Sequence, residues 1–299
     1  MIDGVLHCHI CSSSRLKPRP FGYRFKGNWL GGIQCTSCGI IFLHPQPAAE
    51  DLKQMYSKDY FEGDFRCGHA ESYFDGATLE CLADYSILER IKRHKAIGKF
   101  LEIGCAGGAF LNAAQRIGYE VQGVEFSEEA AQFARQKFSL NVVAGDVGSA
   151  RFPDEAFDVI YMGDVMEHLP NPLATLREIN RIIAREGLLV LECPTQTNAL
   201  FSRLGFVIYS ALDKKVTVQL PPYHLFEFRR KSLTSLLHRC GFKIVRSVES
   251  ILSPKEIALR GSVLQRIGKR LFQYPNYFIT TILGILGDRI EIFATKAND

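Results

Sequence analysis

The chain has 299 residues, of which 46% are hydrophobic and 23% are charged, and its formal net charge at pH 7 is +4. This composition is that of a folded globular protein and excludes an intrinsically disordered chain. The small positive charge does not require a nucleic-acid partner, and none is expected, although a local basic face is compatible with it.

The N-terminal segment, residues 1–11, contains no basic region followed by an apolar stretch. We therefore expect no secretory signal and a cytoplasmic location. The chain has nine cysteines, and in this setting they indicate metal binding or reduced thiols rather than disulfides.

Four of the cysteines form two Cys-x-x-Cys pairs, Cys8 with Cys11 and Cys35 with Cys38. Two such pairs, each on a tight turn, bring four thiolates to one tetrahedral zinc ion. Aromatic residues alternate between positions 21 and 29, as they do in the strands of a hairpin. We predict a zinc-ribbon module over residues 1–47, with a structural zinc because four protein ligands leave no open position. The alternative is four unrelated free thiols.

The segment HPQP, residues 44–47, marks a boundary, and residues 48–98 are expected to form a helical linker or lid. From residue 99 to residue 299, short apolar runs alternate with helical patterns such as 128–138 and 172–183. The seven runs are 100–104, 120–126, 141–146, 157–164, 187–194, 242–249 and 289–296. This alternation predicts an α/β fold with a doubly wound, mostly parallel seven-stranded sheet, whose ligands bind at the carboxyl ends of the strands.

The first of these strands contains Glu102 and leads into a turn of small residues, with the pattern E-x-G-x-A-x-G formed by Glu102, Gly104, Ala106 and Gly108. Such a turn lets the amides of the following helix approach a ligand closely. The pattern resembles motif I of the class I S-adenosylmethionine-dependent methyltransferases, in which the acid and the turn hold the methionine part of the cofactor. Cys105 belongs to the same turn. Alanine at position 106 must avoid a positive φ or carry strain.

Two further acids follow in the order that this resemblance implies. Glu125 ends the second strand and is placed to bind the ribose hydroxyls, and Asp146 is placed to bind the adenine amine. Phe126, Val147 and Gly163 complete the expected cofactor contacts. A hydride-transferring enzyme would also accept Glu125, but the acid within the first strand and Asp146 favour the methyl donor. The resemblance implies a Rossmann-like methyltransferase fold.

The fourth strand ends in the segment 162–172, MGDVMEHLPNP. It resembles the E-x-x-E-H stretch of ubiquinone-pathway O-methyltransferases and small-RNA 2'-O-methyltransferases, which can bind a divalent ion beside the acceptor hydroxyl. Glu167 and His168 match that stretch, and Asp164 stands where its first Glu would be. Oxygen with imidazole ligands suits magnesium, manganese or zinc. The alternative is a loop in which Glu167 and His168 only satisfy backbone groups.

A second histidine region starts at residue 221 and reads PPYHLFEF. It resembles stretches of the sugar C-methyltransferases and of the small-RNA enzymes, and both comparisons put His224 near the acceptor. A neutral imidazole there can remove a proton as the methyl group is transferred. The alternative is a loop histidine that hydrogen-bonds to backbone.

Two apolar insertions, near residues 199–220 and 251–287, are expected to form helices over the strand ends. They would be a lid or the wall of an acceptor pocket. Contact with an anionic membrane surface, or with anionic substrates such as nucleotide-linked sugars or phosphates, is the alternative.

These patterns predict an S-adenosylmethionine-dependent methyltransferase that acts on a small-molecule acceptor. O-methylation in secondary metabolism or surface-glycan synthesis is the expected reaction, with His224, His168 and Glu167 on the acceptor side. The alternatives are a sugar C-methyltransferase, a metal-dependent RNA 2'-O-methyltransferase and a non-catalytic zinc-ribbon scaffold. The sequence does not indicate an oligomeric state.

Overall fold

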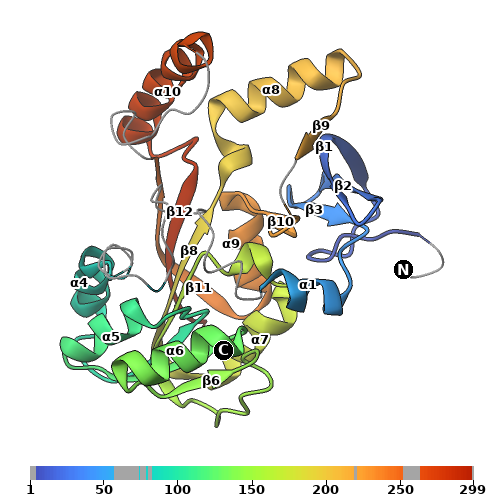
Figure 1. The fold of residues 1–299 in the computed structure, drawn as a ribbon. Helices are drawn as coiled ribbons and strands as arrows, with labels where there is room; N and C mark the ends of the chain where they lie inside the picture. The colour runs from blue at the N-terminus through green and yellow to red at the C-terminus, as the bar shows by residue number, and fades with distance from the viewer. Residues whose placement is uncertain are drawn as a thin grey trace.

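The computed structural model describes residues 5–56, 74, 79, 83–218, 221–251 and 263–297. Within these residues the chain forms two sheets, a seven-stranded sheet flanked by helices and a five-stranded sheet near the N-terminus (Figure 1). Of the predicted helical segment 48–98, residues 57–73, 75–78 and 80–82 lie outside the described residues. Its described parts include the helices α1 (Ala49–Met55) and α4 (Tyr85–His94).

The seven-stranded sheet contains all seven of the predicted apolar runs, in the order β11-β12-β8-β7-β4-β5-β6. The strands are β4 (Lys99–Ile103), β5 (Glu120–Glu125), β6 (Val142–Ala144), β7 (Phe157–Gly163), β8 (Ile183–Pro194), β11 (Phe242–Ser250) and β12 (Arg289–Lys296). Strands β6, β5, β4, β7 and β8 run parallel, and β12 is antiparallel to both of its neighbours. The predicted doubly wound, mostly parallel sheet is confirmed.

Apolar cores on both faces hold the sheet between helices. Alternate residues of β7 point to opposite faces, so Val159 joins one buried cluster and Ile160 joins the other. The first cluster includes residues of α4, α5 (Ala109–Arg116) and α6 (Glu128–Phe138), and the second includes residues of α7 (Pro172–Ile182) and α9 (Arg230–Arg239). This arrangement leaves the carboxyl ends of the parallel strands as the place for a ligand.

The five-stranded sheet has the order β10-β3-β2-β1-β9. The predicted hairpin is present as β1 (Leu16–Phe25) and β2 (Asn28–Cys35), followed by β3 (Ile41–His44). Two strands from much later in the chain complete it, namely β9 (Val216–Val218), parallel to β1, and β10 (Phe226–Glu227), antiparallel to β3. The cysteine-containing segment therefore shares a sheet with the segment that follows His224.

The apolar insertions form helices, as expected. Residues 199–212 correspond to α8 (Leu200–Ala211), and α10 (Val263–Leu283) covers much of the second insertion, of which residues 252–262 lie outside the described residues. Both helices extend away from the seven-stranded sheet (Figure 1). Among the described residues, none of the helices combines the length and the apolar character that crossing a membrane requires.

Candidate functional site

A cleft of about 440 Å³ lies at the carboxyl ends of the parallel strands β4, β5, β6 and β7. Seven of the predicted cofactor residues line it: Gly104, Ala106, Glu125, Phe126, Asp146, Val147 and Gly163. The acceptor-side residue His168 lines the same cleft. The structure thus brings together residues that are separated by more than sixty positions in sequence.

The turn after β4 needs its small residues because the backbone is left-handed and tightly packed. Gly104 has a φ of +75°, and a Cβ atom there would lie 2.4 Å from Cγ2 of Val165. Gly108 has a φ of +79°, and a Cβ there would lie 2.8 Å from the Cβ of Ala134. Ala106 adopts a φ of +45°. It therefore does not avoid a positive φ and carries the backbone strain that was the other expectation for this position.

Glu125, at the end of β5, is a fixed hydrogen-bond acceptor at the wall of the cleft. Its carboxylate accepts the backbone N–H of Ala106 at 2.8 Å and that of Ser127 at 2.9 Å. The residue is only 6% exposed. Two backbone donors on a buried carboxylate hold its orientation, so it is positioned before any ligand binds.

Glu102 lies on β4, beneath the turn, and is 5% exposed. Burial, and then the nearby charge of Glu125, raise the pKa of its carboxyl group well above the ordinary value. Its Oε2 atom makes no hydrogen bond within the described part of the chain. A buried carboxyl oxygen without a hydrogen-bond partner favours a cationic or hydrogen-bond-donating group on the ligand side of the turn.

Asp146 lies in the loop after β6, where its Oδ1 atom accepts the backbone N–H of Ser149 at 2.7 Å. This local turn presents the residue to the cleft. By contrast, Glu102, Cys105 and Gly108 are not among the residues that line the cleft. The thiol of Cys105 packs against β5 close to Gly123, and burial raises its pKa well above the ordinary value.

The acceptor-side histidines lie together, and of the two it is His168 that lines the cleft. The ring centroids of His168 and His224 are 5.0 Å apart. Nδ1 of His168 is 2.8 Å from the carbonyl oxygen of Tyr223 and 2.8 Å from the hydroxyl of Tyr56. Nδ1 of His224 is 3.7 Å from a carboxylate oxygen of Glu227.

The metal ligand set expected from the sequence requires a correction. Potential ligand atoms of Glu167, His168 and His224 lie within 4.8 Å of one another. The carboxylate of Asp164 instead pairs with Arg289, at 2.8 and 3.2 Å. The structure therefore groups His224, rather than Asp164, with Glu167 and His168, and it pairs Asp164 with Arg289.

Sequence reasoning did not identify the contributions of α1 and α7 to the cleft. Leu52 and Tyr56, at the end of α1, line it together with Leu169, Asn171 and Thr175 around the start of α7. Asn171 also caps α7, with its side chain accepting the N–H of Ala174. The Asn-Pro pair at 171–172 is a helix-start signal that was available in the sequence, whereas Tyr56 belongs to no motif.

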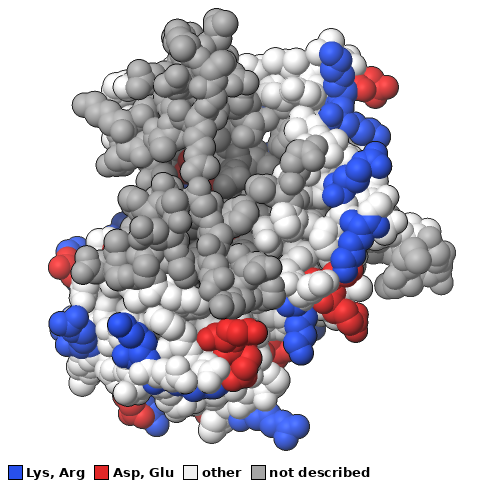
Figure 2. All heavy atoms as spheres, in the orientation of Figure 1, with Lys and Arg blue, Asp and Glu red and all other residues white. Residues whose placement is uncertain are grey.

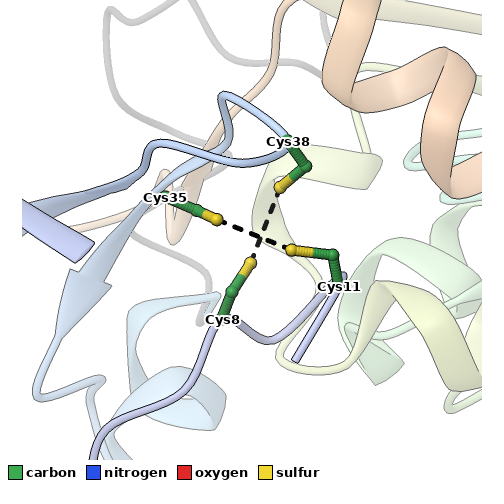
Figure 3. Close-up of side chains that lie close together, drawn as sticks. All are labelled: Cys8, Cys11, Cys35 and Cys38. Atoms are coloured by element: carbon green, nitrogen blue, oxygen red, sulfur yellow. Dashed lines mark hydrogen bonds between the residues drawn. The ribbon is translucent and has the colours of Figure 1, made fainter. Parts of the chain in front are cut away.

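The four N-terminal cysteines converge on one point (Figure 3). The sulfur atoms of Cys8 and Cys38 are 3.6 Å apart, and those of Cys11 and Cys35 are 3.5 Å apart. A tetrahedral zinc with Zn–S bonds of about 2.3 Å requires sulfur separations of about 3.8 Å. Hydrogen bonding from Cys38 lowers the pKa of Cys8 to about 5, and the same hydrogen bond raises the pKa of Cys38 well above its ordinary value, which favours a thiolate at Cys8. The residues fit a structural zinc ion.

Comparison with known proteins identifies the family. The family model described as a methyltransferase domain matches residues 74–247, which is more than half of the chain. The chain belongs to this methyltransferase family. A demethylmenaquinone methyltransferase of Staphylococcus saprophyticus is 30% identical over 172 residues, which cover 51% of this chain and 73% of that protein.

Two further comparisons cover different shares of the matched proteins. A ubiquinone biosynthesis O-methyltransferase of Actinobacillus pleuropneumoniae is 28% identical over 109 residues, or 33% of this chain and 47% of the relative. The crystal structure of an S-adenosylmethionine-dependent methyltransferase from Archaeoglobus fulgidus matches with a TM-score of 0.51 and 24% identity, over 73% of this chain and 94% of that one. This likeness confirms the Rossmann-like methyltransferase fold.

The family and the cleft together establish an S-adenosylmethionine-dependent methyltransferase. The cleft fits the cofactor, because side chains are absent at Gly104 and two acids, Glu125 and Asp146, face the cavity. The expected class of enzyme is confirmed. The acceptor is not established by these comparisons.

Proposed function

We propose that this methyltransferase transfers a methyl group to a hydroxyl oxygen of a small-molecule acceptor. The observation that carries the proposal is the pairing of His168, which lines the cleft, with His224, whose ring lies 5.0 Å away. Two neighbouring imidazoles, one of them in the lining of a cofactor cleft, suit the removal of a proton from an acceptor hydroxyl. The similarity to a demethylmenaquinone methyltransferase and a ubiquinone biosynthesis O-methyltransferase is consistent with a small-molecule acceptor.

In this proposal His224 is the general base. Its Nδ1 atom faces Glu227 at 3.7 Å, and we assign the Nδ1 proton to this side, which leaves Nε2 free of a proton. A neutral Nε2 can accept the hydroxyl proton as the oxygen attacks. Glu227 orients the ring, as a carboxylate does in other base–carboxylate pairs.

His168 has a positioning role in the proposal. Its Nδ1 atom is held by the carbonyl of Tyr223, and its ring contacts those of Tyr56 and His224. This leaves its Nε2 atom on the side of Glu167, 3.5 Å from a carboxylate oxygen. The ring thereby forms a fixed wall against which an acceptor is oriented.

Bound S-adenosylmethionine supplies an electrophilic methyl group on a sulfonium ion. Glu125 and Asp146 hold the cofactor at its ribose and adenine in this proposal, and the turn from Gly104 onward holds the methionine part. The protein then contributes alignment of the attacking oxygen and exclusion of water. Glu102 would stabilise a cationic group beneath the turn.

A divalent ion at Glu167, His168 and His224 is the second candidate arrangement. The three ligand atoms lie within 4.8 Å of one another, and their oxygen and imidazole chemistry suits magnesium, manganese or zinc. The ion would bind the acceptor oxygen and replace His224 as the group that promotes its deprotonation. An RNA 2'-O-methyltransferase would use this arrangement.

The reaction is tested with zinc-loaded protein and S-adenosylmethionine labelled in its methyl group. The acceptors are hydroxylated aromatics, nucleotide sugars and short RNA, each with and without added Mg²⁺ or Mn²⁺. We expect label on oxygen of a small molecule, without a requirement for added metal. Transfer to RNA that depends on added metal would contradict the proposal, as would label found only on nitrogen or carbon.

Replacing His224 with alanine should lower turnover about 100-fold, because general-base catalysis contributes about 10²–10⁴-fold to rate. Affinity for S-adenosylhomocysteine should stay within a factor of about two, since other residues bind the cofactor. His238→Ala, at an exposed position at the end of α9, is the matched control. Unchanged turnover in the His224 variant would assign the base elsewhere.

A further inference from the structure

Three arginines from distant parts of the chain surround the segment that joins β8 to α8. Arg19 lies on β1, Arg203 lies in the first turn of α8, and Arg229 follows β10. The joining segment is a short helical turn, η2 (Gln196–Asn198). The side chains of Arg203 and Arg229 contact this turn, and that of Arg19 packs on α8, the helix that follows it.

Contacts with η2 and α8 hold each of the three guanidinium groups. Arg229 donates through Nη2 to the carbonyl oxygen of Thr197 at 3.0 Å, and Arg203 donates through Nε to that of Asn198 at 2.9 Å. The guanidinium of Arg19 lies over the ring of Phe206 on α8, 4.5 Å from the ring centroid. Neutral groups therefore position all three charges.

None of the three forms an ion pair with a carboxylate within the residues that the structure describes. Partly buried arginines elsewhere do so, as Arg230 does with Glu249 and Arg289 does with Asp164. Burial, followed by the charges of Arg203 and Arg19, lowers the pKa of Arg229 to about 10 despite the opposing influence of Glu227. The repulsion that lowers this pKa is relieved by an anion.

Polar atoms at this position also lack partners. The Nε atoms of Arg19 and Arg229 and the hydroxyl oxygen of Thr197 are buried without a hydrogen-bond partner in the described part of the chain. Buried donors of this kind are rare in folded proteins unless a ligand or water satisfies them. In addition, α8 begins here without a side-chain cap, and the N-terminus of a helix favours negative charge.

One flank of the molecule is also positive (Figure 2). In Figure 2 the flank of the molecule that carries the five-stranded sheet and the end of α8 shows a row of lysine and arginine side chains and few acids. Arg203 is exposed, so an anion can reach the cluster from solvent. A positive flank raises the local concentration of anionic ligands and speeds their association.

We infer that Arg19, Arg203 and Arg229, together with Thr197, form a binding site for a phosphate or diphosphate group of the acceptor. Arginine suits this task because its planar donors match phosphate oxygens in pairs. The site lies outside the cofactor cleft, since none of its residues lines that cleft. Arg229 follows His224 by five residues, which limits the distance between their Cα atoms to about 18 Å.

The inference rests on the proposed function, because the anion site would define the class of acceptor whose hydroxyl reaches His224. A diphosphate links either a nucleoside or a lipid to a sugar, and both would present the same group to the arginines. The acceptor would be anchored by its phosphates and methylated on the attached moiety. Binding energy from this remote anchor can be used to orient the hydroxyl at the reacting end.

The inference is tested by calorimetric titration of the zinc-loaded full chain with inorganic pyrophosphate at low salt. We expect one saturable site, with affinity weakened at least about tenfold in Arg19→Gln and in Arg229→Gln, since each variant loses charge-assisted hydrogen bonds to the anion. Arg24→Gln, at an exposed position on the same strand as Arg19, is the matched control and should change affinity less than about twofold.

Titration with a nucleoside diphosphate and with a prenyl diphosphate then identifies the source of the diphosphate group. The compound that binds more tightly indicates whether the acceptor carries a nucleoside or a lipid. Absence of pyrophosphate binding, or equal binding in the wild type and both variants, would overturn the inference. Titration of the same samples with S-adenosylhomocysteine separates the two hypotheses. Binding of S-adenosylhomocysteine without binding of pyrophosphate would reject the anion site and leave the methyl-transfer proposal standing. Binding of pyrophosphate without binding of S-adenosylhomocysteine would reject the methyl-transfer proposal.

Discussion

Alanine in place of Glu125 is expected to weaken binding of S-adenosylhomocysteine about 100-fold. The carboxylate is buried, and two backbone N–H groups hold its orientation at the cleft wall. Two charge-assisted hydrogen bonds to the ribose hydroxyls, at about 1.5 kcal/mol each, amount to about 3 kcal/mol. Calorimetric titration of the wild type and the variant measures the difference directly.

Two further variants separate a lost ligand contact from a disturbed turn. Glu125→Gln keeps an oxygen that can accept the N–H of Ala106 or Ser127 but removes the charge, and it should weaken binding by an intermediate amount. Glu120→Ala, at an exposed position at the start of the same strand, should bind like the wild type. Equal affinity in Glu125→Ala and the wild type would remove Glu125 from the cofactor site.

Strand positions and the strand-end acids could be predicted because their signals are local. A buried parallel strand needs a short apolar run, and the runs from 100–104 to 289–296 are all strands of one sheet. A residue that ends a parallel strand, as Glu125 does, or lies just after one, as Asp146 does, must lie at the ligand-binding edge. The periodicity and the topology therefore determine the cleft wall without any knowledge of side-chain packing.

Long-range partners could not be predicted in the same way. The spacing of Asp164 and His168 matches a metal-binding stretch, but the spacing carries no information about Arg289, which lies 125 residues later and neutralises the aspartate. Tyr56 contacts His168 although 112 residues separate them. Such contacts depend on how the sheet and its flanking segments pack, and this follows from the whole fold.

The pairing of β10 with β3 is a further example, and it connects the cysteines to the acceptor end. Phe226 pairs with Phe42 and Glu227 pairs with Ile41. The strand that follows His224 is therefore part of the five-stranded sheet, in which Cys35 ends β2. Ile10 and Ile40 belong to the same buried cluster as Phe226. The two-residue strand is too short to be recognised by periodicity.

This connection predicts the consequence of replacing Cys35 with serine. Cys35 is fully buried, and its sulfur lies 3.5 Å from that of Cys11. Zinc affinity should fall by more than about 100-fold, because even loss of a group that only orients a ligand costs about 10–100-fold. The N-terminal sheet should lose stability, since binding of a structural zinc contributes directly to folding.

The effect should reach the acceptor end and spare the cofactor cleft. Without a stable β3, the segment from His224 to Glu227 loses its pairing, so turnover should fall more than ten-fold, a loss of at least about 1.4 kcal/mol of transition-state stabilisation. Affinity for S-adenosylhomocysteine should remain near that of the wild type because the cleft lies at the edge of the other sheet.

Metal analysis and thermal unfolding of the purified chain test this expectation. One equivalent of zinc should accompany the wild type, and Cys240→Ser, which alters an isolated buried cysteine of the methyltransferase fold, should retain it. A wild-type chain that contains no zinc and unfolds at the same temperature as Cys35→Ser would show that the four thiols are ordinary core residues. A variant that loses zinc and keeps full turnover would instead show that the five-stranded sheet does not position His224. In that case β10 would be held by Leu225, whose N–H donates to the carbonyl oxygen of Glu167 at 2.8 Å.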